Sequence, residues 1–229
     1  MIPDLGVIIA AGGSSRRYGE KDKLLEILGN MPVFCHSIVN FLPLTAPGNL
    51  IVAVRQEALD EYRQCAEKFL PVDRVCWVAG GRDRVVSVRN ALAKLKLSSG
   101  LVAIHDAARP LASAQLLLKV AARARISGGA IAANKVADSL KLADENGFIK
   151  VPVDRSMVYH AETPQIFDLA KYRIACGKLD GIVPTDDAEI MRLAGFPVEL
   201  VESGQWNMKL TSPEDLAKLQ NCFTGCLHG

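Results

Sequence analysis

The opening stretch of the chain, residues 5–23, limits most strongly what this sequence can fold into. Its first part, Leu5–Ala11, is an apolar run rich in β-branched residues that predicts a buried strand, and glycines and serines fill residues 12–15. Four cationic residues follow closely: Arg16, Arg17, Lys21 and Lys23. Small residues let backbone N–H groups approach an anion without steric interference, and the cations balance its charge. This arrangement predicts a binding loop for a polyanion, and for a triphosphate above all.

The opening loop carries neither of the two common glycine signatures of nucleotide-binding proteins. No G-x-G-x-x-G pattern fits it, and the P-loop pattern fails because Glu20 follows Gly19. These failures disfavour a dinucleotide-binding or P-loop protein. Arg16 and Lys23 nevertheless suit catalysis at phosphorus, because they can neutralise charge that builds up on phosphoryl oxygens. A solvated basic loop without function is the alternative interpretation.

Strand-like and helix-like segments alternate along most of the chain. Strands are predicted at residues 5–11, 50–54, 74–79, 101–104 and 129–133, and helices at 32–42, 57–69, 85–95 and 113–126. The alternation predicts an α/β protein with a doubly wound, mostly parallel, Rossmann-like sheet in a single domain over residues 1–229. After residue 163 the chain returns to this sheet, with strands at 166–167 and 198–201, the segment 206–210, and a last helix that begins near Pro213.

Residues 135–160 depart from this alternation. Polar and apolar residues alternate over 138–142, a turn follows at 145–147, and Phe148 and Ile149 continue beyond it. This pattern indicates a β-hairpin inserted in the domain. Because an isolated two-stranded arm cannot bury both of its faces, we expect it to pack on a second copy of the chain.

Composition narrows the possible partners and the compartment. The 27 Lys and Arg residues nearly balance the 25 Asp and Glu residues, so no diffuse basic surface for nucleic acid is expected. We find no apolar run of about 20 residues and no signal-peptide pattern, so we expect a cytoplasmic protein without membrane contact. The six cysteines are scattered without a C-x-x-C pair, which indicates reduced thiols. Cys222, Cys226 and His228 could share a metal, but we interpret this terminal spacing as incidental and predict no metal ligands.

The strand end at residues 105–110 offers a second group of candidate site residues. Ligands of open α/β sheets bind beyond the carboxyl ends of the strands, and Asp106 follows the predicted strand 101–104. Its carboxylate can accept from a substrate hydroxyl or help to hold Mg²⁺. Arg109, three residues on, is suited to a phosphate of the same small ligand. An Asp that only caps a turn is the structural alternative, and His105 is interpreted as a hydrogen-bonded structural histidine.

Several segments occur in the order expected of one enzyme family. They are Ala10-Ala11-Gly12, Arg16, Lys23, His105-Asp106-Ala107-Ala108-Arg109-Pro110, Val153-Asp154-Arg155, Thr163-Pro164-Gln165, Thr185-Asp186-Asp187-Ala188 and Lys209-Leu210-Thr211. On these residues the chain resembles the 2-C-methyl-D-erythritol 4-phosphate cytidylyltransferase family over essentially its whole length. The resemblance implies transfer of CMP from CTP to methylerythritol phosphate, with release of pyrophosphate, in isoprenoid precursor biosynthesis. It also implies Mg²⁺ bound mainly through the CTP phosphates, no nucleophilic side chain, and a homodimer held by the arm.

The resemblance assigns roles to individual residues. The catalytic residues it implies are Arg16, Lys23 and Lys209. The nucleotide-binding residues it implies are Ala10, Ala11, Gly12, Gly13, Ser14, Gly81, Arg82, Ser87 and Ala107. The substrate-binding residues it implies are Asp106, Arg109, Ser139, Arg155, Thr163 and Thr185, with Ser139 and Arg155 reaching the substrate phosphate from the partner subunit.

Three residues depart from the family pattern. Ser14 replaces a glycine and Arg17 a methionine of the family loop, so either of two adjacent arginines can face the phosphates; the register favours Arg16. Ser139 replaces a threonine and keeps its hydroxyl.

Two other functions remain open from the sequence. One is ribitol 5-phosphate cytidylyltransferase, a similar enzyme of the same fold, which more usually has serine and valine where this chain has Ala107 and Ala108. The other is a nucleotide-binding module without turnover. Joint retention of Arg16, Lys23, Asp106 and Lys209 argues against it, because a binder needs no groups aimed at the reacting phosphorus.

Overall fold

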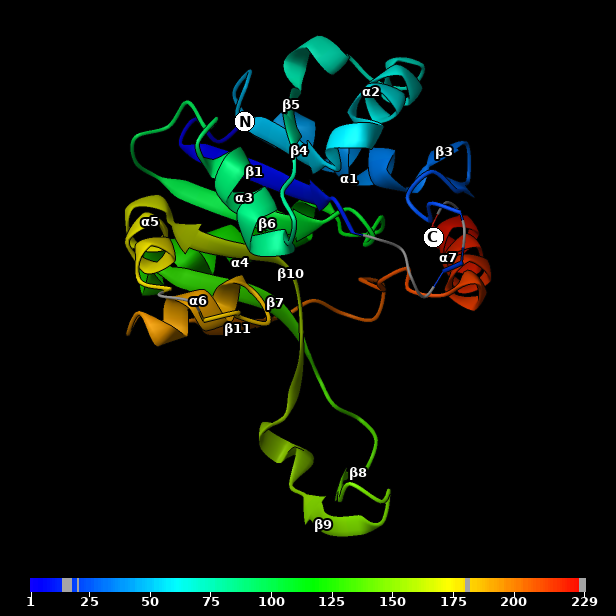
Figure 1. Cartoon of the computed structure of the whole chain (residues 1–229), viewed down its shortest axis with the longest axis vertical. Coiled ribbons are helices and arrows are strands. Elements are labelled where there is room, and N and C mark those ends of the chain that lie inside the picture. Colours follow the sequence, from blue (N-terminus) through cyan, green and yellow to red (C-terminus); the bar gives the residue numbers. More distant parts are fainter. Residues whose placement is uncertain (14–17, 20, 180–181, 227–229) are drawn as a thin grey trace.

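A seven-stranded sheet forms the centre of the computed structural model, which describes residues 1–13, 18–19, 21–179 and 182–226 (Figure 1). The strand order is β11-β7-β10-β6-β1-β4-β5. The strands are β1 (Leu5–Ala11), β4 (Leu50–Val54), β5 (Cys76–Ala79), β6 (Leu101–Asp106), β7 (Gly129–Lys135), β10 (Tyr159–Asp168) and β11 (Glu199–Glu202). Strand β10 runs antiparallel to β6 and β7, and the other neighbouring pairs are parallel. The predicted α/β fold with a mostly parallel sheet is therefore confirmed.

Strand β1 lies in the middle of this sheet and sets the position of the opening loop. It pairs with β4 on one side and β6 on the other, with Ala10 opposite Asp106 and Ala11 opposite Val54. Nearly all its side chains are buried, as expected for a central parallel strand that reads as a continuous apolar run. The loop after Ala11 therefore begins at the same edge of the sheet at which Asp106 lies.

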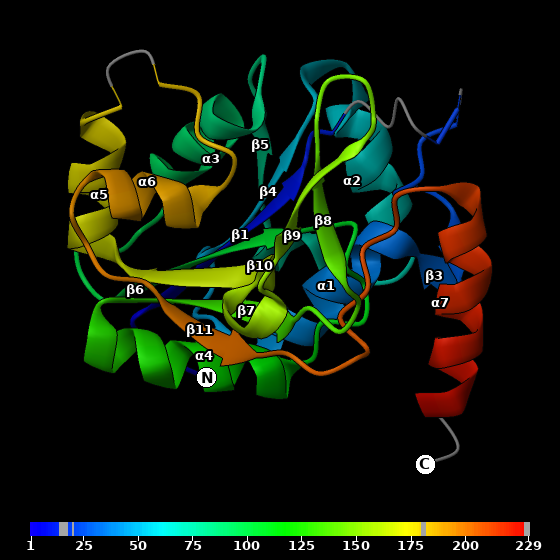
Figure 2. The ribbon, with the colours of Figure 1, turned by 90° about the horizontal axis from the view of Figure 1, so that it is seen from below.

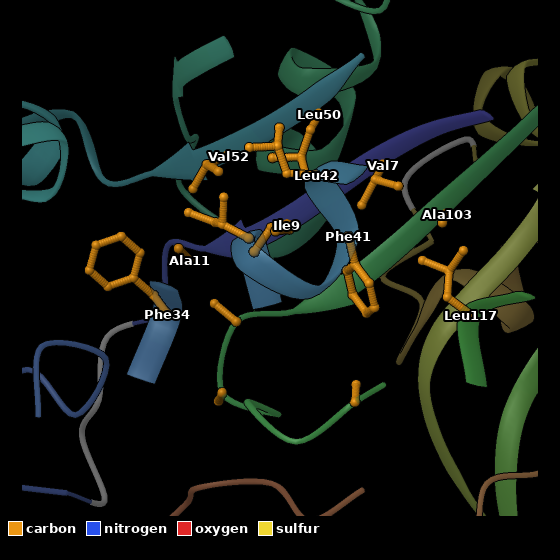
Figure 3. Packing of buried hydrophobic residues seen from close by; sticks show 14 of the residues in the cluster. Val7, Ile9, Ala11, Phe34, Phe41, Leu42, Leu50, Val52, Ala103 and Leu117 are labelled. Atoms are coloured by element: carbon orange, nitrogen blue, oxygen red, sulfur yellow. The ribbon is translucent and has the colours of Figure 1, made fainter. Parts of the chain in front are cut away.

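Helices cover both faces of the sheet. They are α1 (Val33–Phe41), α2 (Leu59–Glu67), α3 (Arg84–Leu92), α4 (Ala114–Ser127), α5 (Leu169–Gly177), α6 (Asp187–Leu193) and α7 (Pro213–Cys226). Helices α1, α2 and α4 contribute to the core on one face, and α3, α5 and α6 to the core on the other. Figure 3 shows Phe34 and Phe41 of α1 on the strand side chains of the first core, where full burial of each aromatic ring stabilises the fold by about 1.5–3 kcal/mol.

The C-terminal helix α7 packs beside a short hairpin formed by β2 (Ile27–Leu28) and β3 (Met31–Pro32) (Figures 1 and 2). The turn of this hairpin contains Gly29, whose φ is +61°, and a Cβ atom there would lie 2.3 Å from the ring of Phe223. A glycine at this turn therefore permits both the left-handed backbone and the close approach of α7. The packing of α7 fixes where the preceding segment, residues 206–211, crosses the molecule.

The predicted arm is a separate hairpin that extends away from the sheet (Figure 1). It consists of β8 (Leu140–Ala143) and β9 (Ile149–Val153), which pair antiparallel. Several of its apolar side chains are open to solvent, and Phe148 is 72% exposed and Met157 84% exposed. The hairpin prediction is confirmed, and packing of the arm on a second copy stays a prediction.

Three segments differ from the sequence-based expectation. The strand predicted at 166–167 is the end of the longer, antiparallel β10. Residues 206–210 do not form part of the sheet, because they cross from β11 to α7 over the loop after β6, where Leu210 N donates to Ala108 O at 2.8 Å. Strand β5 starts two residues later than predicted, since residues Val72–Arg74 form a 3₁₀ turn first. The path of residues 206–210 matters for the site because it brings Lys209 to the end of β6.

Candidate active site

A cleft of about 360 Å³ lies beyond the carboxyl ends of β1, β5 and β6. Many of the predicted site residues line it together: Ala10, Gly12, Gly13, Lys23, Gly81, Arg82, Ser87, Asp106 and Lys209. They come from the opening loop, the loop before α3, the end of β6 and the segment before α7. The structure thus brings most of the predicted nucleotide-binding residues and both predicted catalytic lysines to one cavity.

Asp106 is the anionic centre of this cleft. Its Oδ2 accepts from Lys209 Nζ at 2.5 Å, and its Oδ1 lies 3.5 Å from Arg84 Nη2. Burial by itself would raise the pKa of Asp106, but the charges of Lys209 and Arg84 outweigh burial and hold the pKa well below its ordinary value. The carboxylate is therefore ionised at neutral pH and suited to accept hydrogen bonds from hydroxyl groups.

The loop that carries Lys23 is tied to the body of the domain by its neighbour Asp22. The carboxylate of Asp22 accepts from Arg55 Nη2 at 2.9 Å and from the hydroxyl of Tyr62 at 2.8 Å. Lys23 Nζ donates to Leu210 O at 2.8 Å, so this lysine meets the same C-terminal segment that supplies Lys209. Two ammonium groups, from Lys23 and Lys209, therefore line the cleft.

His105 supports the end of β6 from within the core. The ring is fully buried, with Nε2 3.2 Å from Arg109 O and Nδ1 3.1 Å from Thr163 Oγ1. Because Thr163 Oγ1 also accepts from Asp106 N at 3.0 Å, its hydroxyl hydrogen is available to His105 Nδ1, and Nε2–H then donates to Arg109 O. His105 is a structural histidine, as predicted, and with Thr163 it fixes the backbone at Asp106.

The buried His105 makes stability depend on pH. Burial lowers the pKa of His105 to about 4 from an ordinary value of 6.5, so between these values the unfolded chain binds more protons than the folded one. We expect acidification from pH 6.5 to 4 to remove roughly 3 kcal/mol of folding free energy through this residue. Urea unfolding at a series of pH values checks this in wild-type protein and in His105→Gln. Burial also lowers the pKa of His36, but that effect is common to both proteins. Equal pH slopes for the two proteins would contradict the expectation.

Arg109 does not share a cavity with Asp106, although the sequence spacing suggested one ligand for both. Its guanidinium is buried, with Nη1 donating to Asn207 O at 2.6 Å and lying 3.8 Å from Glu162 Oε2. Asn207 Nδ2 also donates to Glu162 Oε2 at 2.8 Å. Arg109 therefore faces a second hollow of about 340 Å³, which adjoins the main cleft through Lys209, a residue that lines both.

The remaining predicted residues lie in three kinds of place. Ala11 and Ala107 have their side chains in the core. Thr185 is exposed on the loop before α6, where its hydroxyl donates to Glu189 Oε2 at 2.9 Å. Ser139 and Arg155 are exposed on the arm, and the Arg155 guanidinium donates to Ala137 O. Ser14, Arg16 and Arg17 lie outside the described residues, so their roles stay predictions.

Sequence reasoning missed Arg84 and its partner Asp187. Arg84 is the first residue of α3, lines the main cleft, and binds both Asp106 and the buried Asp187. Tyr172 donates its hydroxyl to Asp187 Oδ1 at 2.5 Å. The only signals were an arginine just after the glycine junction at residues 80–81 and an acid within the segment 185–188. Neither signal shows that the two residues meet.

The fold and the cleft define a nucleotidyltransferase-type α/β enzyme. The chain is similar to the solved 4-diphosphocytidyl-2C-methyl-D-erythritol synthase of Anaerococcus prevotii, with a TM-score of 0.82 and 25% identity over 96% of this chain and 98% of the other. It is also similar to the solved 2-C-methyl-D-erythritol 4-phosphate cytidylyltransferase of Thermus thermophilus, with a TM-score of 0.78 and 27% identity over 95% and 97% of the two chains.

The chain belongs to the 2-C-methyl-D-erythritol 4-phosphate cytidylyltransferase family, whose model matches residues 5–224. Two relatives with that name show the same relationship by sequence. The protein of Aquifex aeolicus is 36% identical over 96% of this chain and 97% of its own. The protein of Syntrophus aciditrophicus is 34% identical over 94% of each chain.

Proposed function

We propose that this chain transfers CMP from CTP to the phosphate of methylerythritol phosphate. In this reaction a phosphate oxygen of the polyol forms a bond to the α-phosphorus, the bond from that phosphorus to the bridging oxygen breaks, and pyrophosphate leaves. The convergence of Lys23, Lys209 and the ionised Asp106 in one cleft carries the proposal, because it pairs sites for anions with a site for hydroxyl groups. No nucleophilic side chain is needed, since the second substrate supplies the attacking oxygen.

The two lysines serve the reacting phosphates in this proposal. Ammonium groups near the α-phosphorus stabilise the charge that grows on its oxygens and hold the two anionic substrates together. Arg16 is proposed to act with Lys23 on the triphosphate. Asp106 binds hydroxyls of the erythritol chain, and Arg109, Thr163 and Thr185 are proposed to surround the same substrate.

The loop before α3 is proposed to bind the cytosine ring. Ser87 Oγ accepts from Gly81 N at 3.0 Å and donates to Asp83 O at 2.8 Å, so the loop is held in one shape. A Cβ atom at position 81 would lie 2.1 Å from Val86 Cγ1, which shows how closely this loop packs on α3. We propose that this loop contacts the cytosine and excludes a purine, as the family resemblance implies.

Mg²⁺ is proposed to bind mainly through the CTP phosphates. Among the described residues, no group of three His, Cys, Asp or Glu side chains is placed to hold a metal ion. Two carboxylates, Asp83 and Asp106, line the cleft, and this donor set fits Mg²⁺, which commonly takes one or two carboxylates together with substrate phosphates. When bound, Mg²⁺ neutralises charge on the triphosphate.

The active form is proposed to be a homodimer in the cytoplasm, acting on small molecules without nucleic acid or membrane contact. The apolar side chains exposed on the arm support the dimer, because a second copy would cover them. Ser139 and Arg155 would then serve the partner's site. The free cysteines Cys35, Cys65, Cys76, Cys176 and Cys222 fit a reducing compartment. Within the described chain, no helix combines the length and the apolar character needed to span a bilayer.

Pyrophosphate release tests the proposed reaction. The protein is incubated with CTP and Mg²⁺ and with methylerythritol phosphate or ribitol 5-phosphate in parallel. We expect release with methylerythritol phosphate at a much higher kcat/KM than with ribitol 5-phosphate. Preference for ribitol 5-phosphate would overturn the choice of substrate, and CTP binding without release from either polyol would indicate a nucleotide-binding module.

A further inference from the structure

Four charged side chains form a continuous series of ion pairs from the core to the cleft. In order they are Asp187 at the start of α6, Arg84 at the start of α3, Asp106 at the end of β6, and Lys209 before α7. The two ends of this path differ most in exposure: the side chain of Asp187 is 1% exposed and that of Lys209 is 41% exposed, with 32% for Arg84 and 15% for Asp106 between them. The series therefore begins at Asp187, which is buried in the protein, and ends at Lys209, which is accessible to ligands.

The two cations that hold Asp106 differ in how firmly they are fixed. Arg84 is held from behind by the buried carboxylate of Asp187, which is itself held by the hydroxyl of Tyr172. Planar guanidinium groups suit such bridging because their donors form a rigid fork. Lys209 carries a single point charge on a flexible stem and is the most exposed of the four. Arg84 is thus a fixed partner of Asp106, whereas Lys209 is a mobile one.

The proposed reaction requires Lys209 to serve a second group. The ammonium group of Lys209, which donates to Asp106 at 2.5 Å, has three N–H donors and can bind a phosphate as well, but the phosphate charge then competes for it and weakens its pairing with Asp106. Asp106 then needs another cation to remain ionised and oriented for the polyol hydroxyls. Only a partner that keeps its place when substrates bind can supply this.

We propose that Arg84 is a positioning residue that holds the Asp106 carboxylate toward the polyol hydroxyls when Lys209 turns to the α-phosphate. The inference rests on the proposed function, because it assumes that Asp106 binds the polyol. Arg84 acts through Asp106, and Asp187 with Tyr172 acts through Arg84. Polyol binding is therefore coupled to α6, although α6 itself contributes no residue to the main cleft.

Steady-state kinetics of Arg84→Gln separate this role from a general structural one. We expect KM for methylerythritol phosphate to rise about tenfold, which corresponds to the loss of one charge-assisted contact, while KM for CTP changes less than about threefold. Asp187→Asn and Arg84→Lys should shift the same KM in the same direction by less, because each keeps part of the bridge. If Arg84→Gln does not fold, these two variants carry the test. Arg89→Gln is the matched control, since Arg89 lies on the same helix but donates to Cys176 O on α5.

A double-substitution cycle identifies Asp106 as the target. In an Asp106→Asn background, Arg84→Gln should cause no further rise in KM for methylerythritol phosphate. An undiminished rise in that background, or an equal rise in KM for CTP and for methylerythritol phosphate, would overturn the role of Arg84 while leaving the proposed function intact. A wild-type protein that releases no pyrophosphate with methylerythritol phosphate would overturn the proposed function and this inference with it.

Discussion

Replacement of Lys23 by alanine is expected to lower kcat by about 10²–10³-fold, the usual cost of removing one group that stabilises transition-state charge. The ammonium group of Lys23 lines the cleft beside Gly12 and Gly13, where the proposed triphosphate lies. The substitution also removes the hydrogen bond that this ammonium group donates to Leu210 O. The free energy of unfolding should therefore fall by only about 1 kcal/mol. Initial rates at saturating substrates, together with urea unfolding, measure both effects.

Lys94→Ala is the control for this substitution, because Lys94 follows α3 and is exposed outside the cleft. It should leave kcat within about twofold of the wild-type value, as most surface substitutions do. Arg16→Ala should lower kcat as Lys23→Ala does. If Lys23→Ala and Arg16→Ala both retained the wild-type rate, the assignment of these residues to catalysis would be wrong.

The second large effect is recovery of activity when two inactive variants are mixed. Lys23→Ala damages the site on its own subunit, whereas Arg155→Ala is proposed to damage the site of the partner. A mixed dimer of the two variants holds one intact site, with Lys23 from one subunit and Arg155 from the other. After subunit exchange at equal concentrations, activity should rise from near zero to about a quarter of the wild-type value, since half of the dimers are mixed and one site in two is intact.

A control mixture shows whether the recovery has this cause. Lys23→Ala mixed with Asp106→Ala should recover nothing, because both residues line the same cleft of one chain and neither site of a mixed dimer is intact. Equal recovery in the two mixtures, or none in either, would contradict the proposed contribution of the arm to the partner's site. Sedimentation of the mixtures checks that dimers form in both.

Local sequence patterns were sufficient to predict most of the fold. Apolar runs fixed the bounds of β1 and β4, and the helix predicted from residue 113 is α4, which Ser113 caps with its hydroxyl accepting from Leu116 N at 3.1 Å. The direction of strand pairing and the path of irregular segments were harder to predict from the sequence. Antiparallel β10 and the irregular segment 206–210 depend on contacts with distant residues, which leave no periodic signal in the chain.

The candidate site was predicted best where it follows strand ends. Gly12, Gly81 and Asp106 lie at the carboxyl edge of the sheet because that edge is set by the strands themselves. The spacing of Asp106 and Arg109 does not bring their side chains into one cavity, since the chain turns between them, with Arg109 N donating to Asp106 O at 3.0 Å, and the Arg109 side chain reaches Asn207. The contact of Arg84 with Asp187 joins two helices about a hundred residues apart, and no local pattern predicts it.

The configuration at phosphorus tests direct attack on CTP most directly. The protein is supplied with methylerythritol phosphate and with one diastereomer of CTP that carries sulfur on the α-phosphorus, and the configuration of the product is determined. A single in-line displacement by the substrate phosphate inverts that centre, and inversion is the expected result. Retention would require two displacements through a covalent CMP–enzyme intermediate and would contradict a site that works through Lys23, Lys209 and Asp106 without a nucleophile.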